Sequence, residues 1–298
     1  MNNYNNDYIL NPNFVTGLTD AEGCFFVHLR KDKRTKIKKN VQLQFTIKML
    51  KNETELLNMI KSFFNCGILW HYNKDGTVRF RVNDFSSIKK KVIPHFLKYP
   101  LRGTKHLDFL SFKEALHIID KKEHLREEGL KKLYLLSKSM NTGREFPINN
   151  YYSPNHTKEN NNDYIPLNGH YVNGFIAGDG CLSLHTGKLF GSMYLSISQH
   201  INNKLLMISL ANYFKSSSKV YLASTNYLEI KLSGVRLWEN VIFEHFKEYP
   251  LYGSKNFKLK KFLRIRELKK DNKHLIQIGK IRKWKPDYKL RILEIWKS

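Results

Sequence analysis

Two acidic residues, Glu22 and Asp179, occupy the same place in two similar segments of the chain. Glu22 stands next to the end of VTGLTDAEG (15–23), and Asp179 stands next to the end of VNGFIAGDG (172–180). Two carboxylates brought together repel each other unless a proton or a divalent cation lies between them. Oxygen ligands suit a hard cation, for which Mg²⁺ is the best candidate. The pair therefore predicts a magnesium site, provided that the fold brings the two segments together.

The elements that carry the two carboxylates are predicted to be helices that pack against each other. Gly17 and Ala21 are four residues apart in the first segment, as are Gly174 and Gly178 in the second. Such stripes of small residues let two helix backbones approach closely. Since glycine inside a helix costs ~1 kcal/mol relative to alanine, these glycines need a packing reason. We expect the two helices to meet along the stripes, which places the carboxylates side by side.

The chain is a tandem repeat. HFLKYPLRGTK at 95–105 and HFKEYPLYGSK at 245–255 lie 150 residues apart and share seven of eleven residues. The two acidic motifs lie 157 residues apart, so the second copy lacks seven residues that the first contains. We assign this difference to the basic run 31–40, interpreted as a hairpin tip, where length changes are best tolerated. Self-similarity of this kind predicts two units of one fold.

Hydrophobic periodicity predicts an α+β fold in which each repeat runs helix, hairpin, helix, hairpin, helix, helix. The strand at 41–48 alternates apolar residues with Gln, Thr and Lys, so one face of each sheet should be covered by helices while the other stays polar and basic. We place the first repeat at 1–145 and the second at 169–298. Between them, 146–168 is rich in Asn and Pro and is interpreted as a linker.

Composition points to a polyanionic partner. The 298 residues include 51 Lys and Arg against 26 Asp and Glu, a net charge of +25, and nucleic acid is the leading candidate for such an excess. An acidic membrane surface is the competitor, but no apolar stretch approaches the ~20 residues that span a bilayer.

The three cysteines show neither disulfide nor zinc spacing, which favours a reducing compartment. The first residues, MNNYNNDYIL, resemble neither a secretion signal nor a transit peptide.

These segments resemble a known family. VTGLTDAEG and VNGFIAGDG are similar to the two signature helices of the LAGLIDADG homing endonucleases in their single-chain, two-repeat form. LQFTIKMLKNETELL, LSISQHINNKLL, the YPLxGxK elements and KEHLREEGLKK are similar to that family too, so the resemblance covers most of the chain. It implies two pseudo-symmetric αββαββα repeats, with the motif helices packed at the interface. Their antiparallel sheets would form a saddle over the major groove of a long, asymmetric DNA site.

The resemblance also implies an activity, namely a site-specific double-strand break with short 3′ overhangs made by a monomer with Mg²⁺, for which Mn²⁺ would substitute. By this resemblance Glu22 and Asp179 are metal ligands and catalytic residues. The set of metal ligands would be completed by main-chain groups of the neighbouring residues, Ala21, Gly23, Gly178 and Gly180. Cations at such a site polarise the phosphate, lower the pKa of attacking water and stabilise the leaving oxygen.

Further site residues are carried over position by position. Lys105 and Lys255, at the ends of the YPLxGxK elements, match the active-site lysines that stabilise charge near the scissile phosphate. Gln199 matches a polar position that orders active-site water, whereas its repeat partner Met49 cannot do so. The site is therefore expected to be asymmetric. Asp20 lies inside the first motif opposite Ala177, so a structural hydrogen bond is expected of it rather than a metal contact.

The residues expected to touch DNA are polar and lie on the outward face of the predicted strands. They are Arg30, Gln42, Gln44, Lys48, Arg79, Arg81, Tyr194 and Ser196. Repeated histidines, such as His95 and His245, are expected to be buried or to cap helices, because no cysteine or carboxylate flanks them at ligand spacing.

Two rival functions share this fold. A group I intron maturase would bind intron RNA, and a degenerate copy would only bind DNA as a regulator. Neither needs both carboxylates, so the retention of Glu22 and Asp179 favours the nuclease, although one protein could also combine cleavage with RNA binding. Lys, Asn and Ile are abundant relative to Ala, Gly and Pro, which suggests an A+T-rich genome and hence an organelle such as the fungal mitochondrion.

Overall fold

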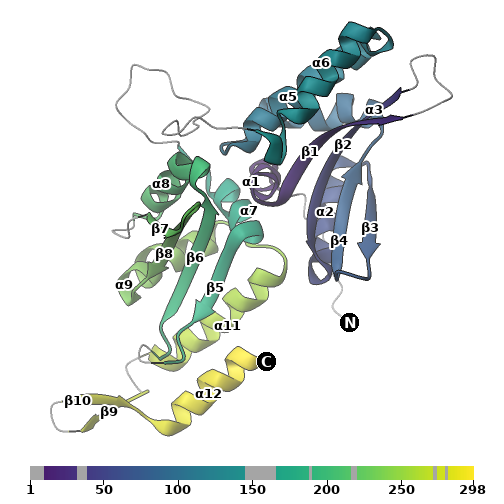
Figure 1. The fold of residues 1–298 in the computed structure, drawn as a ribbon. Helices are drawn as coiled ribbons and strands as arrows, with labels where there is room; N and C mark the ends of the chain where they lie inside the picture. The colour runs from purple at the N-terminus through teal and green to yellow at the C-terminus, as the bar shows by residue number, and fades with distance from the viewer. Residues whose placement is uncertain are drawn as a thin grey trace.

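Each half of the chain folds as a four-stranded antiparallel sheet with helices packed on its apolar face (Figure 1). The structure is a computed structural model that describes residues 10–31, 39–144, 166–187, 190–215, 220–270, 274–278 and 281–298. Most of the predicted linker and the tip of the predicted basic hairpin lie outside these ranges. The predicted α+β fold is confirmed, with both sheets placed beside a central pair of helices.

The first repeat begins with the motif helix and continues as a pair of hairpins and helices. Its elements are α1 (Pro12–Glu22), β1 (Gly23–Lys31), β2 (Lys39–Leu50), α2 (Thr54–Phe64), β3 (Ile68–Tyr72), β4 (Thr77–Val82), a helical segment made of α3 (Phe85–Ser87), a π turn (Ile88–Val92) and α4 (Ile93–Lys98), then α5 (Lys105–Asp120) and α6 (Glu127–Lys138). The strand order is β1-β2-β4-β3.

The second repeat follows the same path. Its elements are α7 (Gly169–Asp179), β5 (Gly180–Leu184), β6 (Met193–His200), α8 (Lys204–Tyr213), β7 (Tyr221–Ser224), β8 (Tyr227–Ser233), α9 (Val235–Leu237), a π turn (Trp238–Ile242), α10 (Phe243–Glu248), α11 (Ser254–Lys269), β9 (Leu275–Ile278), β10 (Ile281–Trp284) and α12 (Pro286–Lys297). The order β5-β6-β8-β7 repeats that of the first sheet. None of the described helices is long and apolar enough to cross a membrane.

The two repeats differ at their C-terminal ends. The sequence predicts two consecutive helices in both, but in the second repeat a hairpin of β9 and β10 separates α11 from α12. The 150-residue offset places the hairpin segment over REEGLKK, which forms the start of α6. The second copy reads IQIGKIRKW here, and its alternating isoleucines favour a hairpin, whereas the charged residues of the first copy favour a helix.

Burial follows the predicted alternation on the apolar faces, where Phe45, Ile47 and Phe80 are fully buried. On the outer face, however, Gln44 and Thr46 of β2 are also buried, with 6% and 3% of their surface exposed. β2 is a central strand, flanked on both sides by β1 and β4. Outward side chains of β2 therefore lie between those of two neighbouring strands, so an outward position on this sheet does not ensure exposure.

The expectation that the repeated histidines are buried is confirmed for His95 and His245. The Nε2 of His95 lies 3.1 Å from the Thr16 hydroxyl, and that of His245 lies 2.7 Å from the Asn173 side-chain oxygen. Both motif helices are thus tied to the helix that precedes the YPLxGxK element of their own repeat. Burial lowers the pKa of each imidazole to about 4.

The two buried histidines should make the protein sensitive to acid. A lowered folded-state pKa means that the unfolded chain binds protons more strongly, so this stability is present above pH 6.5 and is lost as the pH falls toward 4. For each ring the loss should be on the order of 3 kcal/mol by pH 4. Chemical denaturation from pH 7 to pH 4 measures it, and His245→Gln should flatten the pH dependence. An unchanged slope in this variant would contradict the assignment.

Candidate active site between the two repeats

The two motif helices, α1 and α7, pack against each other at the centre of the molecule (Figure 1). A Cβ on Gly17 would overlap the carbonyl oxygen of Tyr171, and a Cβ on Gly174 would overlap that of Phe14. At the far end of the pair, a Cβ on Gly178 would meet the Ala21 side chain and lie 3.0 Å from Cγ of Glu22. The small-residue stripes thus meet as predicted, and this contact brings the carboxylate ends together.

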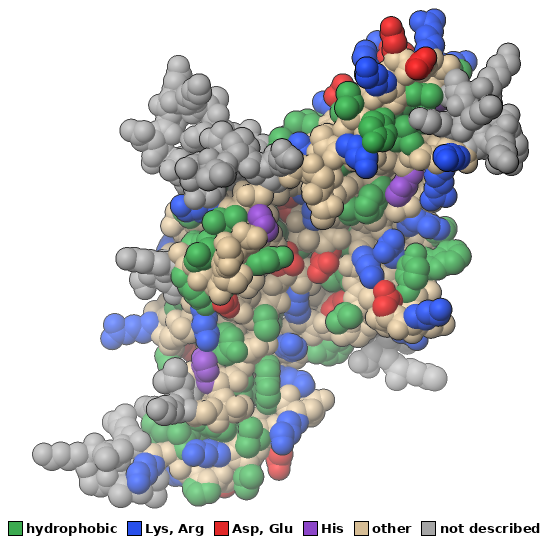
Figure 2. Space-filling model, viewed as in Figure 1, with side chains coloured by type: hydrophobic (Ala, Val, Ile, Leu, Met, Phe, Trp, Pro, Cys, Tyr) green, Lys and Arg blue, Asp and Glu red, His purple; other side chains and the backbone are tan. Residues whose placement is uncertain are grey.

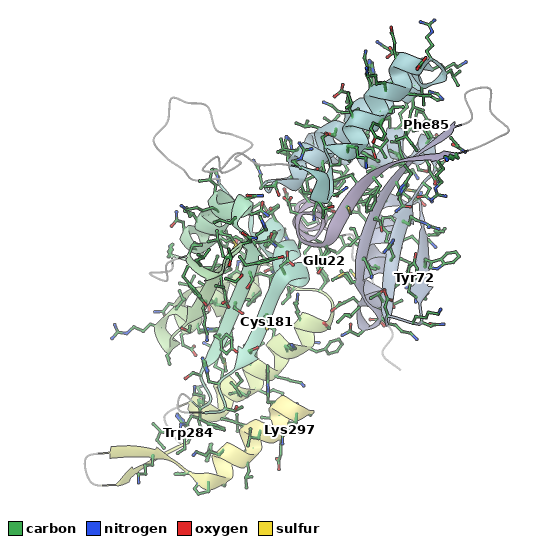
Figure 3. All side chains as sticks on the ribbon, in the orientation of Figure 1. Glu22, Tyr72, Phe85, Cys181, Trp284 and Lys297 are labelled. Atoms are coloured by element: carbon green, nitrogen blue, oxygen red, sulfur yellow. The ribbon has the colours of Figure 1, made fainter. Side chains whose placement is uncertain are left out.

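Glu22 and Asp179 are the last residues of α1 and α7, and each is followed directly by the first strand of its repeat. Figure 3 shows Glu22 where the two halves meet. Burial raises the pKa of Glu22, although Lys105 and Lys255 oppose the rise. Burial and the charge of Glu22 together raise the pKa of Asp179 to about 6. The two carboxylates therefore share one desolvated, mutually repulsive environment.

Lys105 and Lys255 lie beside the carboxylates and bind the C-terminal ends of the motif helices. The ammonium of Lys105 donates to the carbonyl oxygens of α1 at the end of the helix, at 2.9 to 3.2 Å. Lys255 donates to the carbonyl oxygens of Ala177, at 2.8 Å, and of Gly178. A cation at this end also offsets the negative end of the helix dipole. Burial lowers the pKa of Lys255.

Gln199 contacts Asp179 directly. Its side-chain amide donates to Oδ2 of Asp179 at 2.5 Å, and its oxygen accepts a hydrogen bond from the amide of Asn203 at 2.8 Å. Met49, its partner in the first repeat, is buried and apolar. The chain therefore builds a polar link behind Asp179 that it does not build behind Glu22. This asymmetry was expected from the sequence, whereas the participation of Asn203 was not.

Asp20 is buried in a structural network, as its unmatched position predicts. It accepts hydrogen bonds from the hydroxyl of Tyr171, at 2.8 Å, and from the backbone N–H groups of Arg102 and Gly103. Burial raises its pKa. Asp20 thus joins α7 of the second repeat to the loop that precedes α5 of the first.

The donor set at the helix ends fits a hard divalent cation. It consists of the carboxylates of Glu22 and Asp179 with carbonyl oxygens close by. A cation bound there would offset the burial that raises the pKa of both carboxyl groups and the charge of Glu22 that further raises the pKa of Asp179. Within the described part of the chain no cluster of three or more His, Cys, Asp or Glu side chains suits a metal ion. Main-chain oxygens would have to complete the shell. Those of Ala21 and Gly178 face the lysines, while Gly23 and Gly180 begin β1 and β5.

The polar faces of the two sheets carry the residues that were expected to contact DNA. Figure 2 shows Lys and Arg side chains spread over the viewed surface and a few acidic ones where the halves meet. Arg30 is exposed on β1, while Gln42 and Gln44 lie on β2 and Tyr194 and Ser196 on β6. Their roles stay predictions, and the burial of Gln44 leaves it little surface for a base contact.

The basic residues of these faces have neighbours that the sequence did not suggest. On the first sheet, aromatic rings of β3 lie beneath the arginines of β4, with Arg79 5.2 Å from the Tyr72 ring and Arg81 5.5 Å from the Trp70 ring. Lys48 pairs with Asp75 at 2.9 Å. Alternation of aromatic and basic residues across a predicted hairpin was the signal that could have revealed the stacked pairs. The attraction between each guanidinium group and the ring beneath it holds both arginine side chains in place.

The motifs and the fold match known proteins. A family profile described as LAGLIDADG endonuclease matches residues 15–116 and 172–266. The chain is 30% identical over 283 residues to probable intron-encoded endonuclease 2 of Neurospora crassa, covering 91% of this chain but only 63% of that protein. It is 31% identical over 118 residues to an uncharacterized 50.9 kDa protein in ND4 intron 1 of Podospora anserina, covering 39% of this chain and 26% of that protein.

Solved structures match the whole arrangement of the two repeats. I-SmaMI, bound to an uncleaved DNA target in the presence of calcium ions, has a TM-score of 0.81 and 25% identity, covering 97% of this chain and 98% of that one. I-LtrWI, a LAGLIDADG homing endonuclease bound to target DNA, has a TM-score of 0.79 and 28% identity, covering 96% of each chain. Both matches extend across the two repeats, so the likeness is not confined to the motif helices.

Proposed function

The chain belongs to the LAGLIDADG endonuclease family, and we propose that it is a site-specific homing endonuclease that cuts both strands of a long, asymmetric DNA target. The observation that carries this proposal is the convergence of Glu22 and Asp179, each beside a lysine, at one end of the paired helices. Binding of DNA or RNA alone does not require two desolvated carboxylates. We therefore favour cleavage over the maturase and regulator alternatives.

The residues of the site divide the work of hydrolysis. Glu22 and Asp179 would hold Mg²⁺, which polarises the phosphate and lowers the pKa of attacking water. Gln199, bonded to Asp179, would orient that water, and Lys105 and Lys255 would stabilise the charge that develops on the phosphate. The basic sheet faces would bind the DNA on either side of the cut. We also propose that the protein acts as a monomer, because a single chain holds both repeats. We place it in the mitochondrion, because relatives are encoded in introns and one lies in an ND4 intron.

Selection of cleaved sites from a randomised duplex library tests the proposed function directly. Wild-type protein and Mg²⁺ should enrich one extended asymmetric sequence, cut in both strands, and EDTA should abolish the enrichment. The variant carrying both Glu22→Gln and Asp179→Asn serves as the control for contaminating nucleases. The proposal would be refuted if the protein is folded and binds DNA but enriches no cut sites with any of the divalent cations tested.

The affinity for the selected DNA should fall steeply with salt. With a net charge of +25 and basic residues on both sheets, binding should neutralise several phosphates and release their counterions. A protein that contacts roughly 6 to 10 phosphates loses about 10³-fold in affinity or more between 50 and 200 mM salt, and we expect a loss on this scale. Fluorescence anisotropy across this range measures the slope, and Arg79→Ala should make it shallower. A salt-independent affinity would rule out the basic sheet faces as the binding surface.

A further inference from the structure

The helices that carry the two lysines are capped by the opposite repeat. At the start of α5, the backbone N–H of Thr104 donates to the side-chain oxygen of Asn203 at 2.8 Å. At the start of α11, the backbone N–H of Ser254 donates to both oxygens of Glu53, at 3.0 and 3.1 Å, and the Ser254 hydroxyl also bonds to Glu53. The 150-residue offset pairs Glu53 with Asn203 and Thr104 with Ser254. The contact is therefore a duplicated feature, used once in each direction.

These contacts satisfy groups that a helix leaves unpaired at its N-terminus. Thr104 does not supply a capping bond of its own to α5, and the cap residue of α11, Gly253, has no side chain. In each helix an acceptor from the other repeat therefore replaces the usual local cap, which stabilises a helix N-terminus. On α11 the acceptor is a carboxylate, whose charge also suits the positive end of the helix dipole.

The chain makes room for both acceptors. Glu53 is buried, with 6% of its surface exposed, and a Cβ at Gly253 would overlap its carboxylate. At the equivalent position, a Cβ at Gly103 would lie 3.1 Å from the side-chain oxygen of Asn203. The glycine of each YPLxGxK element therefore opens a space that the side chain of the other repeat fills.

Each capped N–H lies one residue before a lysine of the candidate site. Lys105 and Lys255 extend from the first turns of α5 and α11 to the carbonyl oxygens at the ends of α1 and α7. The position of each helix start sets the position of its ammonium group. Each lysine therefore depends on the motif helix of its own repeat at one end and on a side chain of the other repeat at the other.

We propose that Glu53 and Asn203 are reciprocal positioning residues, through which each repeat sets the lysine of the other. This inference rests on the proposed function of the site. The arrangement is stronger in one direction, because Asn203 also donates to Gln199, which bonds to Asp179. Asn203 thus joins the start of the Lys105 helix to the carboxylate of the second repeat, while Glu53 serves Lys255 without a matching link to Glu22.

Double-mutant cycles on the cleavage step test the proposal. Asn203→Ala should slow single-turnover cleavage of prebound DNA about 10- to 100-fold, on the scale of other residues that orient active-site groups. Combined with Lys105→Met, it should cause a smaller further loss than it does in the wild type, because residues that act through each other are not additive. The loss that remains is the part that Asn203 exerts through Gln199. Combined with Lys255→Met, it should lose the full additional factor. Glu53→Ala should show the opposite pairing, additive with Lys105→Met and non-additive with Lys255→Met.

Conservative variants separate positioning from stability. Glu53→Gln keeps an acceptor oxygen and should recover most of the rate. Asn203→Asp keeps the acceptor for Thr104 but loses the donor to Gln199, so it should recover only the part of the rate that depends on Lys105. Both variants replace the alanine variants if those fail to fold. Glu55 is an exposed acid in the first turn of α2, two residues after Glu53. Glu55→Ala is therefore the matched control and should cleave like the wild type. Effects that add equally with both lysine variants, or caps whose removal changes no rate, would overturn the proposal.

A readout that needs no cleavage keeps the inference distinct from the proposed function. Amide hydrogen exchange at the start of α5 should accelerate in Asn203→Ala but not in Glu53→Ala, and exchange at the start of α11 should show the reverse. If exchange follows this pattern in a protein that cuts no DNA, the proposed function is wrong and the reciprocal capping stands. If exchange at both helix starts stays unchanged in both variants, the capping assignment is wrong whatever the activity.

Discussion

Replacement of Glu22 by glutamine, or of Asp179 by asparagine, is expected to leave DNA binding intact and to abolish double-strand cleavage in Mg²⁺. An amide of the same shape keeps the packing at the helix ends but removes the charge that holds the cation. Cleavage should fall by at least ~10³-fold, on the scale of losing a group that stabilises transition-state charge. Single-turnover assays on the selected target measure the loss, and anisotropy measures binding.

The outcome for the two carboxylates must be specific to their place in the fold. Glu128→Gln, which removes an exposed acid on α6, is the matched control and should cleave normally. Undiminished cutting by either Glu22→Gln or Asp179→Asn would show that the carboxylate concerned takes no part in hydrolysis. Loss of binding together with cleavage would instead assign them a structural role.

The second large effect is expected at the helix interface. Gly174→Val would drive a side chain into the carbonyl oxygen of Phe14 and to within 2.8 Å of the Leu18 nitrogen. Backbone atoms of a packed helix cannot move aside unless the two helices separate. We therefore expect the free energy of unfolding to fall by about 3 kcal/mol, the upper end of overpacking costs, and cleavage to be lost because the carboxylates separate. Urea denaturation measures the first effect.

A glycine in open space provides the comparison for this prediction. Gly187 has no atom near the position of an added Cβ and does not adopt a positive φ. Gly187→Ala should therefore leave both unfolding and cleavage close to wild type. If Gly174→Val were as stable as Gly187→Ala, the close helix contact would not be what holds the two repeats together.

The central features of the site were predictable because they are local and duplicated. The motif helices, their small-residue stripes and the carboxylates at their ends can be read from the spacing of Gly17, Gly174, Glu22 and Asp179, and the structure confirms that the helices meet. The four-stranded sheets were expected from alternation, which depends only on neighbouring residues. The repetition at offsets of 150 and 157 residues then indicated which residues of the two repeats share a structural position.

The remaining features depend on contacts between distant residues. Glu53 and Ser254 are 201 residues apart, and no local pattern shows that one caps the helix of the other. The burial of Gln44 follows from the side chains of neighbouring strands rather than from its own alternation. The β9–β10 hairpin lies between the two helices that were predicted to follow each other directly at the end of the second repeat, because the residues that form it differ from those of the first repeat in local preference. Sequence identity between copies therefore indicated shared architecture better than it indicated shared detail.

Mapping both cuts on the selected target tests the central claim most directly, namely that Glu22 and Asp179 form one centre shared by the two repeats. If the carboxylates act as one centre, the two scissile phosphates should lie close together across the narrow minor groove, about 6 Å wide. We predict one cut in each strand, a few base pairs apart, leaving 3′ overhangs. Cuts confined to a single strand, or two cuts a full helical turn apart, would contradict the account.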